Sequence, residues 1–279
     1  MDKNRFRKNV GSLISDLFEI NSNDMNNFYS YFIIFMEGVF STLISVYICS
    51  FINISNQGLF SIFLVASTFV LRLSQILDNN TKNIIYSKKN IFNSNKNSIT
   101  LVTVIFLGIF TGYIIVSIFI NDGVINYFNF IINLTRKGMI GNRFGPFVAT
   151  FSNNISVMLL FFLLSFIYRS FGMMLIIGWN ACVWGITFST IFIQNKDGNN
   201  INIFLSIIAV TPHLIIEAVS YITTALSAIF LSKAVIIYNF KEETFKSIIK
   251  SVIIMLCFSS FCLFISSLVE SYYTTYLLG

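Results

Sequence analysis

Long apolar runs dominate the hydrophobic pattern of this chain. Runs of about 18 or more apolar residues are long enough to cross a bilayer as α-helices, and they lack the alternation typical of β-barrel strands. The pattern predicts an all-α fold, a polytopic transmembrane helix bundle of about seven spans: Phe28–Ile52, Leu59–Leu77, Ile99–Ile120, Phe147–Ile167, Gly172–Ile193, Ile203–Ile237 and Ile248–Leu268.

The sixth run is too long for one straight crossing. As a single helix it would measure about 52 Å, against about 30 Å of hydrocarbon. Proline disturbs a helix interior but suits a first turn, so Thr211-Pro212 predicts a broken sixth helix with Thr211 as the N-cap. Ile203–Val210 would then be a short re-entrant or interfacial piece, and Pro212–Ile237 one tilted span.

Two shorter segments have the pattern of surface helices. The apolar positions between Val10 and Phe18 follow one helix face, which predicts an amphipathic N-terminal helix on the inner membrane surface or docked on the cytoplasmic face of the bundle. Val124–Leu134 suggests a second surface helix on the outer side. We therefore divide the chain into a cytoplasmic N-terminus (1–27), a two-helix hairpin with a basic inner loop (28–98) and a five-helix membrane core (99–279).

Composition and charge support a membrane protein and predict its orientation. Charged residues make up 11% of the chain, against about 25% in soluble domains. The twelve Lys and Arg residues of the predicted inner segments outnumber the four of the outer segments: Arg136, Lys137, Arg143 and Lys196. This bias predicts a cytoplasmic N-terminus and an outer C-terminus. Because the basic residues cluster at segment ends, no nucleic-acid partner is expected.

Candidate chemistry centres on His213, the only histidine, and Glu217. Ionisable groups at membrane depth cost about 2.5–3.5 kcal/mol on insertion scales, so they mark candidate functional sites. Their four-residue spacing places both side chains on one helix face. Three interpretations stay open: a buried pair that locks neighbouring helices, a proton or transport site, and a catalytic acid/base pair. One histidine and one glutamate leave a zinc site short of ligands, so no metal or cofactor is predicted.

Other polar and small residues suggest contacts between spans. We expect Asn154 and Asn180 to satisfy backbone groups freed at the break beside Pro212. Gly108-xxx-Gly112 and the face from Ser220 to Ala228 favour close helix packing. Charge and proximity in a hairpin suggest an ion pair between Glu37 and Arg72.

Three short motifs then occur in order over about 85 residues. They are Asn153-Asn154 at the start of a span, Gly178-x-Asn180 with Gly185 in the next, and Pro212-His213-xxx-Glu217 in the third. Together they resemble the stage II sporulation protein M family. The resemblance extends from Ile99 to Leu268, the five-helix core of that family. Leu214 stands where family members usually have glycine, and the first two spans look like an addition.

The resemblance implies a non-enzymatic, multi-pass subunit of a bacterial-type cell membrane, a scaffold or assembly factor of a cell-envelope complex. The implied partners are other membrane or envelope proteins, such as peptidoglycan hydrolases, and a homo-oligomer is compatible with it. The alternative is a permease-like subunit of a peptide exporter or maturation complex of the bacteriocin type. The sequence contains no Walker motif, so ATP hydrolysis would come from a separate ATPase subunit. An intramembrane hydrolase comes third.

Overall fold

The computed structural model describes residues 28–52, 57–87, 96–119, 146–194 and 200–274, and these residues form helices without any strand. The elements in chain order are α2 (Phe28–Ile52), α3 (Gln57–Ser87), α5 (Lys96–Phe119), α7 (Pro146–Tyr168), α8 (Ser170–Gln194), α9 (Asn200–Ile237), α10 (Glu243–Leu268) and a short π-helical turn, η2 (Val269–Thr274). Seven of these helices are long and apolar enough to cross a membrane. The prediction of a seven-span, all-α bundle is confirmed. The predicted surface helices near Val10 and Val124 lie outside the described residues.

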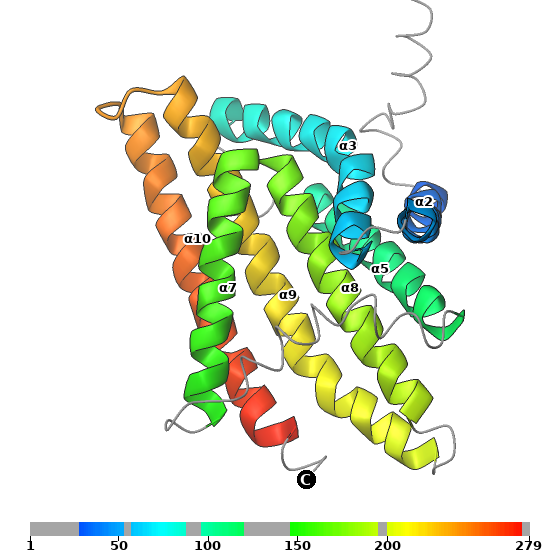
Figure 1. Cartoon of the computed structure of the whole chain (residues 1–279). Coiled ribbons are helices and arrows are strands. Elements are labelled where there is room, and N and C mark those ends of the chain that lie inside the picture. Colours follow the sequence, from blue (N-terminus) through cyan, green and yellow to red (C-terminus); the bar gives the residue numbers. More distant parts are fainter. Residues whose placement is uncertain (1–27, 53–56, 88–95, 120–145, 195–199, 275–279) are drawn as a thin grey trace, which may run out of the picture.

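The helix axes fan out across the bundle. In Figure 1, α7 and α10 run from top to bottom, α8 and α9 run obliquely, and α2 is seen nearly along its own axis. The α7–α8 turn and the α9–α10 loop lie at one end of the bundle, while η2 lies at the other. Helix α9 is the central element of the C-terminal half, because it packs against α7, α8 and α10.

The predicted break in the sixth helix is wrong. Helix α9 is continuous over 38 residues with Pro212 in its interior. Thr211 is therefore not an N-cap, and its hydroxyl donates instead to the carbonyl of Ile207, one turn earlier, at 2.6 Å. Surrounding helices allow a transmembrane helix to tolerate the hydrogen bond that proline removes. Among the residues whose side chains the structure describes, the part of α9 apolar enough to cross a membrane is Val210–Ile237.

A tight corner joins α7 to α8 through one residue. Arg169 adopts a positive φ of 51°, which reverses the chain between the two helices. A Cβ atom on Gly172 would lie 2.2 Å from the carbonyl oxygen of Leu164, so only glycine allows the helices to meet this closely. The guanidinium of Arg169 also donates to the hydroxyl of Ser232 at 3.4 Å, which ties the corner to α9.

Glycine contacts join the N-terminal hairpin to the rest of the bundle. A Cβ atom on Gly108 of α5 would lie 2.4 Å from the carbonyl oxygen of Phe35 and 3.0 Å from the Cα atom of Gly38, both on α2. One turn later, a Cβ atom on Gly112 would lie 2.7 Å from the side-chain Cβ atom of Thr42. The predicted role of Gly108 and Gly112 in close helix packing is confirmed. Small residues at these positions let the two helices approach closely, as is common between helices in membranes.

The predicted ion pair between the first two spans is also confirmed. Both guanidinium nitrogens NH1 and NH2 of Arg72 donate to the carboxylate of Glu37, the second at 3.2 Å from Oε1. This fork-to-fork geometry joins α2 to α3 and pairs the buried Arg72 side chain.

Replacing Gly108 with alanine should destabilise the protein, because the new methyl group meets backbone atoms that cannot move without separating α2 from α5. We expect a loss of about 1–3 kcal/mol in the free energy of unfolding, the usual cost of overpacking. Gly178→Ala is the matched control, since its methyl would come closest to the side-chain Cγ2 of Ile62, at 3.2 Å, and would meet the backbone oxygen of Ile62 only at an ordinary contact distance of 3.7 Å. Thermal unfolding in detergent measures both variants, and equal losses would contradict the backbone-contact explanation.

Candidate functional site

The candidate site begins with one face of α9. His213 and Glu217 are both buried, with 6% and 9% of their surface exposed. Tyr221 follows one turn later on the same face, and its hydroxyl donates to Oε1 of Glu217 at 3.3 Å. The sequence-predicted pair is thus part of a row of three polar side chains inside the bundle.

Two hydroxyl groups join α10 to this face of α9, one donating from each helix to the backbone of the other. The hydroxyl of Ser266 donates to the carbonyl oxygen of His213 at 2.9 Å. Two turns along, the hydroxyl of Ser220 donates to the carbonyl oxygen of Ser259 at the same distance. These bonds run in opposite directions between the antiparallel helices α9 and α10, and they fix the register of the two helices.

Helix α7 brings Asn154 to the same level of the bundle. Phe161 of α7 packs edge-to-face on Tyr221 with ring centroids 4.9 Å apart. Helices α7 and α9 run in the same direction (Figure 1), so Asn154, two turns before Phe161, lies level with the start of the polar face of α9. Asn154 is buried, and its Nδ2 atom has no hydrogen-bond acceptor among the described residues.

A second carboxylate completes the polar group. Glu270 lies on η2, directly after α10, and interacts electrostatically with Glu217. Single turns of π-helix are rare and occur frequently at functional sites. Within the described residues, no three His, Cys, Asp or Glu side chains come together in a way that could hold a metal ion. We call this set of hydrogen-bonding and acidic side chains from α7, α9, α10 and η2 the polar group: Asn154, His213, Glu217, Tyr221, Ser266 and Glu270.

Among the described residues, Asn180 makes no hydrogen bond to this face of α9, and its predicted role at a helix break is wrong. Its Nδ2 atom donates to the carbonyl of Ile176 at 2.9 Å, within its own helix α8. Because α9 is continuous, there is no break for either Asn180 or Asn154 to complete, and the same prediction for Asn154 is wrong as well. It lines a small cavity of about 20 Å³ together with Tyr221 and Ala218. A space of that size has room for about one water molecule.

Sequence reasoning missed two contributors to the site. Ser266 lies inside an apolar span, where a serine carries no distinctive pattern, and only the register with α9 gives it a role. Glu270 follows the predicted end of the last span by two residues. An acidic residue this close to a membrane span marks a candidate functional residue, so the sequence alone could have singled out Glu270. Its proximity to Glu217, however, depends on how α10 packs.

Comparison with known families gives a match that includes the helices of this site. The family model described as Stage II sporulation protein M matches residues 101–275, more than half of the chain. This chain belongs to the stage II sporulation protein M family. The match includes all the helices that build the polar group, from α7 to η2, whereas α2 and α3 lie outside it. No curated protein and no solved structure matches the chain.

Removing the Glu217 side chain should destabilise this family member more than neutralising it. Glu217→Ala leaves the buried Tyr221 hydroxyl without its acceptor, which we expect to lower the free energy of unfolding by about 1–3 kcal/mol. Glu217→Gln keeps an oxygen that can accept from the tyrosine, so its loss should be smaller. Chemical or thermal unfolding in detergent distinguishes the two. A glutamine variant as unstable as the alanine variant would show that this hydrogen bond contributes little.

Proposed function

We propose that this chain is a non-enzymatic scaffold or assembly subunit of a cell-envelope membrane complex. The observation that carries the proposal is that side chains of this region hold neighbouring helices together. Its hydroxyl groups bind carbonyls of neighbouring helices, as in Ser266 with His213 and Ser220 with Ser259. Side chains used in this way hold a bundle in one arrangement, which a scaffold needs in order to present constant surfaces to its partners.

The surroundings of the group also favour assembly over chemistry. Drug-sized ligands occupy cavities of roughly 300–1,000 Å³, whereas the cavity beside Asn180 and Tyr221 has a volume of about 20 Å³. Membership of the stage II sporulation protein M family is consistent with a membrane scaffold. In the proposed orientation the α7–α8 corner and the α9–α10 loop are cytoplasmic, because they carry Arg169, Lys241 and Lys246. The polar group then lies toward the outer side of the membrane.

Purification from native membranes tests the proposal. The tagged full-length chain, extracted in a mild detergent, should bring a stoichiometric envelope protein with it, identified by mass spectrometry. Extraction from membranes without the tag provides the background. A stoichiometric ATPase would instead favour the exporter alternative, with the α9–α10 loop as a candidate coupling surface. No reproducible companion would contradict the scaffold role.

A variant of Glu217 separates a structural role from a chemical one. Glu217→Gln has nearly the same shape and retains an acceptor for Tyr221, so a purely structural site predicts normal assembly and normal function in cells. The measurement combines the purification above with complementation of a strain that lacks the protein. An intact complex together with lost function would contradict the proposal and favour proton transfer or catalysis at Glu217.

A further inference from the structure

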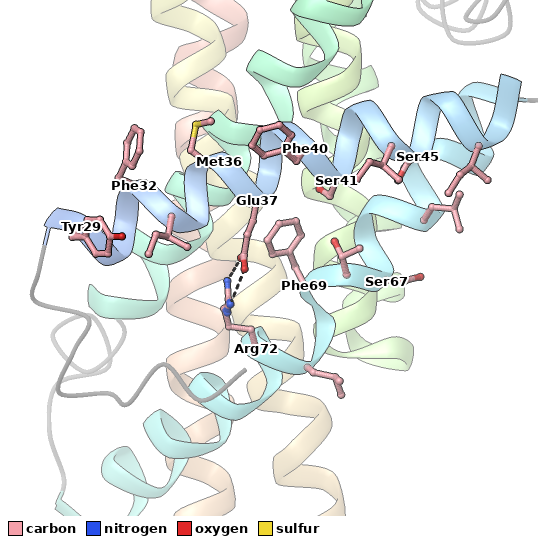
Figure 2. A pocket seen from close by; sticks show the side chains of 16 residues that line it. Tyr29, Phe32, Met36, Glu37, Phe40, Ser41, Ser45, Ser67, Phe69 and Arg72 are labelled. Atoms are coloured by element: carbon pink, nitrogen blue, oxygen red, sulfur yellow. Dashed lines mark hydrogen bonds and ion pairs between the residues drawn. The ribbon is translucent and has the colours of Figure 1, made fainter. Parts of the chain in front are cut away.

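Cationic side chains are unevenly distributed over the bundle. Arg72 has a carboxylate partner, Glu37, and the pair lies on the wall of an apolar groove of about 850 Å³ between α2 and α3 (Figure 2). Every other Lys or Arg whose side chain the structure describes lies at or near the end of the bundle that holds the α7–α8 turn and the α9–α10 loop. These residues are Arg169, Lys233, Lys241, Lys246 and Lys250.

The carboxylates at this end compensate only part of the positive charge. Glu243 forms an ion pair with Lys246, with 2.7 Å between Oε1 and Nζ, but both groups are exposed and water weakens their attraction. Glu242 accepts from a backbone N–H of its own loop at 2.9 Å. No carboxylate pairs with Lys241 or Lys250 among the described residues. The end of the bundle therefore carries an excess of positive charge.

One face of α10 continues from these cations directly into an exposed apolar surface. Lys246 and Lys250 lie near the start of α10, and Ile253, Cys257 and Phe261 follow on the same face at intervals of three or four residues. All five side chains are exposed, Ile253 to 54% and Phe261 to 61%. We call these five residues the lysine stripe. A surface that is cationic at one end and apolar along the rest matches a molecule with an acidic head and a hydrocarbon tail.

The start of α10 adds to the positive potential beside the lysines. The first N–H groups of a helix carry a partial positive charge, and the N-cap residue Glu242 makes no side-chain hydrogen bond to them. Cations at this end oppose the helix dipole. An anion beside Lys246 and Lys250 would be attracted by both side chains and by the helix end.

We propose that the lysine stripe binds an anionic phospholipid, with the phosphate beside Lys246 and Lys250 and an acyl chain along Ile253, Cys257 and Phe261. A zwitterionic lipid has the tail but no net charge to match the excess of cations. An acidic loop of a soluble partner has the charge but would leave the apolar part of the stripe uncovered. In the orientation proposed above, this end meets the cytoplasmic leaflet, whose surface potential is negative. The inference is independent of the scaffold function.

Lipid binding by the purified full-length chain tests the proposal. The chain in detergent is titrated with dioleoylphosphatidylglycerol or dioleoylphosphatidylcholine, and native mass spectrometry measures the bound lipid. We expect the wild-type chain to prefer phosphatidylglycerol. The double variant Lys246→Gln/Lys250→Gln should bind it about 10-fold more weakly, because two of the cations that attract the headgroup are lost. The variant Lys246→Arg/Lys250→Arg keeps both charges and is the matched control. Equal affinity for the two lipids, or an undiminished preference in the glutamine variant, would overturn the proposal.

A soluble headgroup tests the contribution of the apolar part of the stripe. Glycerol phosphate carries the negative charge without an acyl chain, so at the same concentration it should not displace phosphatidylglycerol from the wild-type chain. Displacement at equal concentration would show that the site is a simple phosphate site and would contradict lipid binding along the stripe. Both measurements use the chain without any partner protein, so the purification from native membranes tests the scaffold function separately.

Discussion

The hydrocarbon core of a membrane supplies no water, so each polar group at that depth has to find its partner within the protein or in a neighbouring one. This constraint accounts for most of the specific contacts in the structure. Serine and threonine hydroxyls return to carbonyls of their own helix or cross to the next one, as Ser220 does to Ser259. Arg72 is paired with Glu37, and Glu217 accepts from Tyr221.

The same constraint separates the two polar regions of the molecule. Around His213 and Glu217 the hydrogen-bond partners come from α9 and α10, within the matched family region, and the side chains are buried. Beside the added hairpin, Glu37 is only partly covered and faces an apolar groove. The first region stabilises the bundle by internal contacts. The second is an ion pair whose carboxylate stays partly exposed.

Close backbone approach is the other structural requirement, and glycine meets it at the points where helices touch. Gly108 allows α2 to rest on α5, and Gly172 allows α8 to turn directly back on α7. The contact at Gly108 ties the hairpin to the family core, and the one at Gly172 lies within that core.

The sequence by itself determined the features that depend on composition and local spacing. Apolar run length predicted the seven spans, opposite charges in a hairpin predicted the pair of Glu37 with Arg72, and glycine spacing predicted the contact at Gly108. The four-residue interval placed His213 and Glu217 on one face. Only the tertiary structure decided that α9 continues through Pro212, because packing by three helices outweighs the loss of one hydrogen bond. It also decided that Asn180 binds its own helix and that Ser266 and Glu270 join the polar group. Those outcomes depend on register and side-chain direction between helices, which local sequence patterns do not contain.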